Sequence, residues 1–435
     1  MRETVNRRTF LKKTVGISAG VIGFPYIVGS SALGKDGSPS ANNQITVACV
    51  GVGWQGSGNM NGFLGQNDVR VVAVCDIDAD NLENARKTVN KKYRNEDCQT
   101  YTDYRRMFER KDIDAVMLAL PDHWHGLVGV AAARSGKDIY GEKPLTHNLR
   151  EGRVLCDAVK QYGRIWQTGS WQRSVANFRF ACELVLNGRI GKVSRVEVGL
   201  PAGQHDYAKT KHLTQFGPAP AELDYDTWLG PAPWAPYCPA RVHKNWRWHL
   251  DYGGGQLMDW VGHHVDIAHW GLGLDYSGPV EIEGVGEYPA EGLWNTATRY
   301  RIAAKYAEGI EMTIAGGYSE IKSGTKWIGA DGWVWVDRGK IDAEPKSLLR
   351  EKFGPGEIHL ESPGHTREFL DCVKSRRTTL APCEIAHRSA TPGHLGQIAM
   401  LLRRKIHFDP KTETILNDAT AMEMLSRPMR SPWHF

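Results

Sequence analysis

Buried strands that alternate with helices are the feature that most constrains the fold of this 435-residue chain. Apolar, strand-like runs occupy 45–53, 69–76, 114–121, 138–144 and 164–170, and helical periodicity marks the segments between them, near 55–66, 80–91, 125–135 and 148–162. Near-continuous apolar strands in alternation with helices predict a parallel sheet that is covered by helices on both faces. We therefore expect an α/β domain with a doubly wound parallel sheet over residues 44–170.

A glycine-rich turn follows the first of these strands. The sequence Gly51-Val52-Gly53-Trp54-Gln55-Gly56 opens a helix, and the next strand ends in Asp76, 20 residues beyond Gly56. In this setting GxGxxG indicates a Rossmann-type dinucleotide site, because glycines let the backbone approach the pyrophosphate at the helix N-terminus. Asp76 would bind the adenosine ribose and repel a 2′-phosphate, which favours NAD over NADP. A nucleotide-free glycine turn and a solvated Asp76 remain open alternatives. The cofactor residues predicted here are Gly51, Gly53, Trp54, Gln55, Gly56 and Asp76.

The pattern changes after residue 170. A helix near 177–187 and a strand at 192–201 precede a Pro- and Trp-rich stretch to about 249, a helix near 256–271, and several strands between 280 and 338. Turns at Glu308-Gly309 and Asp331-Gly332 favour antiparallel pairing of these strands. We therefore expect residues 171–435 to form an α+β domain with a mostly antiparallel open sheet, which carries the substrate-binding and catalytic groups.

A lysine stands where the strand at 138–144 ends. The sequence Glu142-Lys143-Pro144 places Lys143 at the carboxyl edge of the predicted sheet, which is the edge where open α/β sheets bind ligands. Pro144 restrains the chain as it leaves the strand. The alternative is that Lys143 is an ordinary solvated loop lysine.

The second part of the chain holds an acid and an imidazole at helical spacing. In the segment from Gly253 to Asp266, which has the pattern GGGxxxDxxxHxxD, Asp259 and His263 stand at i and i+4 on one helix face. A carboxylate beside an imidazole can orient it as a general base, so we expect the two to pair. We expect Asp266 to be structural and His264 to be packed. An ordinary surface pair on a helix remains an alternative for Asp259 and His263.

These three motifs, in this order, resemble the Gfo/Idh/MocA oxidoreductase family, over nearly everything from residue 44 onward. The resemblance implies that Lys143 binds the reacting hydroxyl, that His263 is the base and Asp259 its partner, and that the site is of the inositol-dehydrogenase type. Pro121-Asp122-His123-Trp124-His125 resembles the family's PNxxH loop beside the nicotinamide, with Asp122 in place of the usual Asn. The resemblance adds to the predicted cofactor contacts Pro121, Asp122, His125, Glu142 and Lys143.

The N-terminal segment resembles an export signal. The sequence NRRTFLKK (6–13) has the paired arginines of a twin-arginine signal, and an uncharged stretch follows at 14–34. We expect a signal peptide at 1–34, a polar tether at 35–43, export by the twin-arginine machinery, and a periplasmic or secreted protein without a stable membrane span; a retained anchor is the alternative. The segment TGSWQRSVANFRFACELVLNGRIGKV is similar to a secreted branch of the family. Because NAD is made in the cytosol, folding around it before export would explain the signal.

Charge and composition exclude some classes of protein. The first 34 residues carry five basic side chains and one acidic, so without them the net charge of +5 falls to about +1. A nearly neutral body has no electrostatic footprint for nucleic acid. The histidine pairs at 123/125 and 263/264 do not make a complete metal-ligand set, and hydride transfer needs no metal, so we predict none. The GxSxG motif of serine hydrolases does not occur in residues 35–435 of the sequence; the one match, Gly16 to Gly20, lies in the predicted signal peptide.

Tryptophans cluster around the predicted catalytic helix, at 228, 234, 246, 248, 260 and 270. Aromatic faces suit the apolar faces of sugar rings. For any single Trp a place in the core is the better interpretation, but the cluster in a loop-rich region favours a carbohydrate cleft. The substrate residues predicted from this region and the motifs are Lys143, Arg173, His243, Trp246, Arg247, Asp259 and His263.

The sequence therefore predicts an exported NAD-dependent oxidoreductase that acts on a CH–OH group of a sugar or glycoside, with C3 oxidation preferred by family analogy and with a tightly held cofactor. Since reduced cofactor cannot readily be exchanged outside the cytosol, we expect redox-neutral turnover or reoxidation by an acceptor. Two alternatives remain: an NAD-dependent glycosidase that oxidises its substrate transiently, and a non-catalytic sugar-binding protein. The exposed face of the open sheet often pairs in this family, so a homo-oligomer is also consistent.

Overall fold

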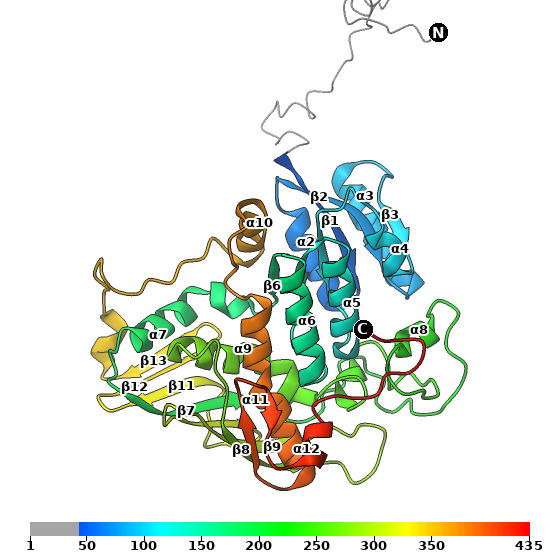
Figure 1. The fold of residues 1–435 in the computed structure, drawn as a ribbon. Helices are drawn as coiled ribbons and strands as arrows, with labels where there is room; N and C mark the ends of the chain where they lie inside the picture. Colours follow the sequence, from blue (N-terminus) through cyan, green and yellow to red (C-terminus); the bar gives the residue numbers. More distant parts are fainter. Residues whose placement is uncertain (1–42) are drawn as a thin grey trace, which may run out of the picture. The chain divides into compact units, whose positions relative to one another are not determined.

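The structure is a computed structural model that describes residues 43–435 (Figure 1). The predicted signal peptide and nearly all of the predicted tether lie outside the described residues. No helix within 43–435 is long and apolar enough to cross a membrane.

The first sheet has six parallel strands in the order β3-β2-β1-β4-β5-β6, as the alternating pattern predicted. Its strands are β1 (Ile45–Val50), β2 (Val69–Cys75), β3 (Gln99–Tyr101), β4 (Ala115–Leu118), β5 (Asp138–Gly141) and β6 (Trp166–Thr168). The edge strand β3 was not predicted from the sequence, because it has only three residues and no apolar run. The strand order reverses beside β1, and this is the point where doubly wound sheets bind ligands.

Helices cover both faces of this sheet. Successive residues of β1 point to opposite sides, so Val47 belongs to one core and Ala48 to the other. The helices on the Val47 side are α2 (Trp54–Leu64) and α3 (Ala79–Tyr93), and those on the Ala48 side are α4 (Tyr104–Phe108), α5 (Asp122–Arg134) and α6 (Leu149–Gln161).

The second sheet has nine strands in the order β13-β12-β11-β7-β10-β9-β8-β14-β15. They are β7 (Val193–Leu200), β8 (Glu281–Glu287), β9 (Arg299–Lys305), β10 (Glu311–Gly316), β11 (Gly324–Gly329), β12 (Trp333–Asp337), β13 (Lys340–Glu344), β14 (Ile406–Asp409) and β15 (Thr414–Ile415). Only β7 and β10 pair in parallel; the other pairs are antiparallel, as predicted.

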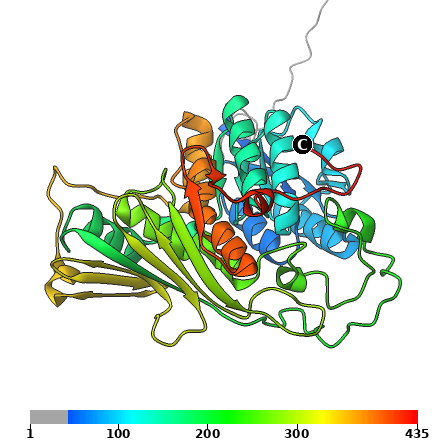
Figure 2. The ribbon, with the colours of Figure 1, turned by 60° about the horizontal axis from the view of Figure 1, so that its bottom comes forward.

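Helices cover one face of the second sheet only (Figure 2). The covering helices are α7 (Ala176–Leu186), α9 (Gly255–Leu272) and α11 (Cys383–Leu402), and they share an apolar core with the strands. Along β9 buried and exposed residues alternate, so the opposite face of the sheet is open.

Segments from the C-terminal third complete the apolar cores on both faces of the first sheet. Helix α10 (His365–Ser375) inserts Phe369 beside Phe63 and Tyr140, and Trp433 packs on Trp124 with ring centroids 4.7 Å apart. The remaining helices, α8 (Tyr225–Leu229) and α12 (Ala419–Glu423), are short. Residues 45–435 form one unit in which the two sheets share these connections.

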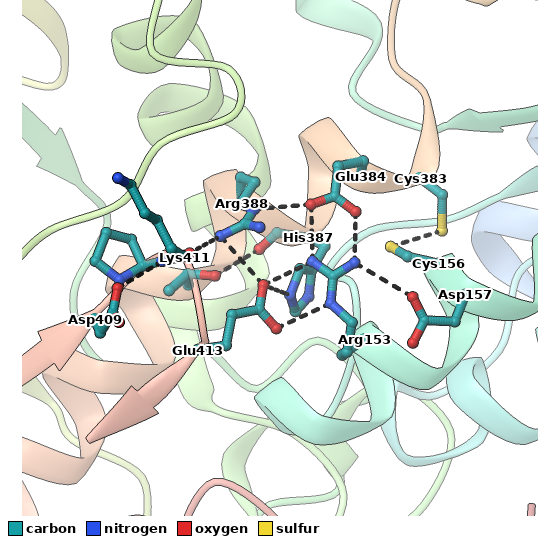
Figure 3. Close-up of polar contacts among 12 residues, drawn as sticks. Arg153, Cys156, Asp157, Cys383, Glu384, His387, Arg388, Asp409, Lys411 and Glu413 are labelled. Carbon is teal, nitrogen blue, oxygen red and sulfur yellow. Dashed lines mark hydrogen bonds and ion pairs between the residues drawn. The ribbon is translucent and has the colours of Figure 1, made fainter. Parts of the chain in front are cut away.

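A charged cluster also joins the two parts (Figure 3). The guanidinium of Arg153, on α6, donates paired hydrogen bonds to Glu384 on α11 (2.7 and 2.8 Å) and to Glu413 in the β14–β15 turn (2.9 and 2.6 Å). Glu413 also accepts a hydrogen bond from His387 Nε2 at 2.9 Å, and Arg388 lies 3.2 Å away. Bidentate pairs of this kind fix the direction of both partners, so the cluster holds α6 against α11.

Candidate active site

A cavity of about 800 Å³ lies at the carboxyl edge of the first sheet. The strand ends that line it belong to β1, β2, β4 and β5, and the facing wall comes from α9, the Trp-rich loop and the turn between β12 and β13. Among the predicted site residues, those that line it are Gly51, Gly53, Trp54, Gln55, Gly56, Asp76, Pro121, Asp122, Glu142, Lys143, His243, Trp246, Arg247, Asp259 and His263.

The glycine turn is shaped for a ligand that approaches the backbone. Gly51 has φ +74°, and a Cβ there would stand 2.3 Å from the carbonyl oxygen of Ala119. A Cβ at Gly56 would stand 1.8 Å from the carbonyl oxygen of Gly51. Helix α2 begins after Gly53 without any side-chain cap, so its first N–H groups face the cavity free to bind a phosphate.

Asp76 holds this turn and faces the same cavity. Its Oδ2 accepts a hydrogen bond from the Val52 N–H at 2.8 Å, and its Oδ1 accepts one from the Asp78 N–H at 3.0 Å. Burial raises the pKa of Asp76 to about 6, against the lowering effect of those hydrogen bonds. The glycine cradle, the open helix end and this carboxylate fit a dinucleotide that lies along the turn.

Lys143 and Asp259 meet at the opposite end of the cavity. The Lys143 Nζ donates to Asp259 Oδ1 at 2.9 Å and to the Asp259 carbonyl at 2.8 Å, and Arg247 Nε donates to the same Oδ1 at 3.1 Å. Burial alone would raise the pKa of Asp259, but the charges of Lys143 and Arg247 lower it well below its usual value. Gly262 makes room for the lysine, because a Cβ there would stand 3.1 Å from Lys143 Cβ.

His263 lines the cavity beside this pair, on the next turn of α9. Its side chain is almost fully buried, and among the described residues its Nδ1 has no hydrogen-bond partner. Burial lowers the pKa of His263 well below its usual value, and the charges of Lys143 and Arg338 add to that effect. The imidazole is therefore neutral at pH 7, and a neutral imidazole has one ring nitrogen that can accept a proton.

We predicted that Asp259 pairs with His263, but among the described residues no hydrogen bond joins the two side chains. Within residues 43–435 the Asp259 carboxylate binds Lys143 and Arg247 instead. A permanent ammonium and guanidinium attract a carboxylate more strongly than a neutral imidazole does, so the cations take the acid that helical spacing had assigned to His263.

Asp122 and Glu142 line the cavity between the two ends. Glu142 Oε1 accepts hydrogen bonds from Asn59 Nδ2 at 2.8 Å and from Gln55 Nε2 at 3.3 Å. Asp122 is the first residue of α5, and burial raises its pKa well above the usual value. The raised pKa favours the protonated carboxyl, which offers both a donor and an acceptor and so resembles the carboxamide of the family's Asn.

Two other predicted site residues, Arg173 and His125, do not line the cavity. Arg173 is only 1% exposed and forms ion pairs with Asp266 and Asp275, both at 2.7 Å, so its assignment to the substrate pocket was wrong and the predicted structural role of Asp266 is explained. His125 does not line the cavity; its nitrogens lie 2.8 Å from the carbonyl oxygens of Pro144 and Leu120, and it positions the strand end that carries Lys143.

His243 lies at the dinucleotide side of the cavity. Its Nδ1 is 3.9 Å from Asp78 Oδ2, beyond the end of β2, and this position does not support the predicted contact with substrate. His264 is fully buried and packs against Trp260, as the helical geometry predicted.

Sequence analysis missed two lining residues near His263. Trp171 lies three residues after the end of β6, and its position next to the predicted strand at 164–170 was a usable signal. Arg338 comes from the β12–β13 turn, 75 residues after His263 in the chain, and no local pattern in the sequence points to it.

Two family models match the chain. The model "Oxidoreductase family, NAD-binding Rossmann fold" matches residues 45–170, and the model "Oxidoreductase family, C-terminal alpha/beta domain" matches residues 182–435. The chain belongs to the Gfo/Idh/MocA oxidoreductase family. The predicted family, fold class and NAD-binding domain are therefore confirmed.

Relatives in this family include dehydrogenases and glycosidases. A glycosyl hydrolase family 109 protein of Shewanella pealeana is 30% identical over 172 residues, which are 36% of this chain and 37% of the relative. A myo-inositol 2-dehydrogenase of Thermotoga maritima is 25% identical over 229 residues, 53% of this chain and 55% of the relative. The chain thus spans about half or less of the length of these curated relatives.

Solved Gfo/Idh/MocA structures share the fold across most of the chain. The myo-inositol 2-dehydrogenase of Lactobacillus plantarum matches with a TM-score of 0.58 at 18% identity, over 84% of this chain and 100% of that one. At this identity the likeness concerns the fold alone.

Proposed function

We propose that this protein is an exported NAD-dependent oxidoreductase that acts on a CH–OH group of a sugar or glycoside. The main observation in support is that one cavity has groups suited to a dinucleotide at one end and groups suited to a sugar hydroxyl at the other. One end is the glycine turn with Asp76, and the other holds the ammonium of Lys143 beside the neutral imidazole of His263. A dinucleotide along the turn and a polyol at the far end would meet between them.

Each group at the far end has a defined task in this chemistry. NAD, when bound, supplies an acceptor for the hydride of the carbinol carbon. Lys143, held by Asp259, donates a hydrogen bond to the reacting hydroxyl oxygen and stabilises the negative charge that develops there. His263 takes the hydroxyl proton on its imidazole, which burial keeps neutral at pH 7.

The finer parts of the proposal depend on the family and on the N-terminal sequence. C3 oxidation and a tightly held cofactor follow from the resemblance to sugar oxidoreductases, and the segment NRRTFLKK supports export by the twin-arginine route. Redox-neutral turnover, or reoxidation by a keto-sugar or a periplasmic acceptor, would then regenerate the cofactor in place.

The main alternative is a glycosidase that uses NAD transiently. The similarity to glycosyl hydrolase family 109 proteins favours it. It differs by the release of free sugar without net reduction of nicotinamide. The non-catalytic alternative is disfavoured because Lys143, Asp259 and His263 are all present in one cavity.

The experiment is to record native mass spectra of the purified protein for retained nucleotide, and then to follow the absorbance of reduced nicotinamide and the products with a panel of glycosides. We expect bound NAD and a keto product, which a His263→Asn variant does not form. His407→Asn, at an exposed histidine of β14, is the matched control and should behave as the wild type. Turnover that His263→Asn leaves unchanged would reject the proposal, and free sugar without a keto product would favour the glycosidase.

A further inference from the structure

Arg338 reaches the substrate end of the cavity from a distant part of the chain. It lies in the two-residue turn between β12 and β13 and lines the cavity together with His263. Trp260 connects the two residues, because its ring centroid lies 4.4 Å from the central carbon of the guanidinium and 5.5 Å from the centroid of the His263 ring. The mechanism proposed above gives this arginine no task.

Two indoles and one amide fix the orientation of this guanidinium. Its central carbon lies 4.8 Å from the ring centroid of Trp171 and 4.4 Å from that of Trp260. The Nε and Nη2 atoms both face Gln172 Oε1 at 3.3 Å. The faces and one edge are therefore occupied, whereas Nη1 has no hydrogen-bond partner among the described residues.

No carboxylate of the described chain pairs with Arg338. Its neighbour Asp337 accepts hydrogen bonds through Oδ1 from the Arg338 main-chain N–H (2.7 Å) and through Oδ2 from Ser323 Oγ (2.9 Å), and its carboxylate forms no ion pair with the guanidinium. Partial burial lowers the pKa of Arg338 more than Asp337 and Asp259 raise it. The arginine is thus preorganised but lacks an anion.

Other arginines of the molecule show the contrast. Arg173 has two aspartates, and Arg247 has Asp259. Arg338 is oriented by two indoles and one amide instead of a carboxylate, and the residue is exposed at the cavity. A planar guanidinium with a free end is the geometry that binds a carboxylate through two parallel hydrogen bonds.

We propose that the free end of Arg338 binds a carboxylate of the substrate, and that the substrate is an acidic carbohydrate of the hexuronate type. This inference rests on the proposed function, since it takes the cavity beside His263 as the sugar site. Trp171 and Trp260 would serve twice, as the stack that orients the guanidinium and as apolar surface beside the sugar ring.

The test compares two probes that differ only in this group, methyl glucuronide and methyl glucoside, in both anomeric forms. Binding to the full protein with NAD present is followed by quenching of tryptophan fluorescence, a readout that needs no turnover. We expect the wild type to bind the glucuronide more tightly, on the order of 10-fold, because a charge-assisted hydrogen bond favours it. In Arg338→Met we expect the ratio of the two affinities to fall to about one.

Lys340→Met is the matched control, since it removes a positive charge from the same hairpin at a residue that does not line the cavity. It should retain the wild-type ratio. Equal affinities in the wild type, or an unchanged ratio in Arg338→Met, would overturn the inference, and the wild-type comparison decides even if that variant does not fold. A preference for a sulfated glucoside over the glucuronide would overturn the assignment of a carboxylate.

The outcomes separate this inference from the proposed function. A protein that prefers the glucuronide but transfers no hydride from any sugar would reject the proposed activity and keep the anion site. A protein that oxidises neutral glycosides without a preference for uronates would keep the activity and reject the role of Arg338.

Discussion

The ammonium of Lys143 donates hydrogen bonds to both the carboxylate and the main-chain carbonyl of Asp259, a residue 116 positions later in the chain. The two contacts join the end of β5 to the first turns of α9, so they connect the nucleotide-binding sheet to the helix that carries His263. A lysine with two fixed acceptors keeps one N–H free for a ligand. The pair therefore aims the ammonium at the cavity and does not merely balance charge.

Replacement of Asp259 by Asn tests whether this residue orients the ammonium of Lys143. The variant keeps the size of the side chain but leaves Lys143 and Arg247 without their anion, so the ammonium should lose its fixed direction. We expect kcat to fall by about 100-fold, the range of a positioned proton-handling group, with a smaller change in KM. Steady-state kinetics on the best glycoside checks this, with thermal unfolding as the control for folding. A change in KM alone would contradict the positioning role.

The glycine turn can be tested by two substitutions in one helix. In Gly56→Ala the new Cβ would stand 1.8 Å from the Gly51 carbonyl oxygen, so the turn must move. We expect loss of NAD binding by calorimetry and about 1–3 kcal/mol lower stability. Gly58→Ala, two residues further, has open space around its Cβ and should bind NAD normally, with about 0.5–1 kcal/mol higher stability. Equal NAD affinity in both variants would place the nucleotide elsewhere.

The raised pKa of Asp122 predicts that the stability of the fold depends on pH. Because burial raises its folded pKa above the unfolded value, the folded state binds more protons, and the stability contribution of Asp122 falls as pH rises from the unfolded pKa toward the folded one. Asp122→Asn cannot ionise, so its stability relative to the wild type should increase over that range. Urea unfolding between pH 4 and pH 7 measures the difference. A flat difference for Asp122→Asn over this pH range would contradict the prediction.

The charged cluster of Figure 3 should stabilise the fold in a pH-dependent way. Burial would raise the pKa of Glu384, but Arg153 and Arg388 lower it to about 2. A lowered folded pKa gives stability that is complete above the unfolded pKa and is lost as pH falls toward about 2. Arg153→Met should cost about 3 kcal/mol at pH 7, since it leaves two half-buried carboxylates without their partner, and should weaken the loss of stability in acid.

The control for that variant is Arg301→Met, which removes an exposed ion pair with Glu320 on the open face of the second sheet. Exposed pairs contribute about 0–1 kcal/mol, so denaturant unfolding should hardly change. Similar losses for the two variants would mean that the Arg153 cluster is no more stabilising than a surface pair.

Features that depend on residues close together in the chain could be predicted from the sequence, whereas contacts between residues far apart in the chain could not. The order of strands and helices, the glycine turn and Asp76 could be predicted because each is a pattern within about 30 residues of chain. The partner of Asp259 could not. Helical spacing pointed to His263, but Lys143 arrives from β5 and Arg247 from the Trp-rich loop, and both bind the carboxylate instead. The prediction that Arg173 lines the substrate pocket failed for the same reason, since the two aspartates that it binds lie about 100 residues away in the chain.

By itself, the sequence determined two features of this protein. One is the doubly wound sheet with its dinucleotide turn, and the other is the set of candidate active-site residues Lys143, Asp259 and His263. Local periodicity and backbone sterics decide these, and both act between near neighbours in the chain. The tertiary structure alone decided which charges pair and which stay free. The nine-stranded sheet brings Arg338 to His263, and only burial and distance show that this arginine has no carboxylate while Arg173 has two. Electrostatic pairing depends on separation in space, which the order of residues does not specify.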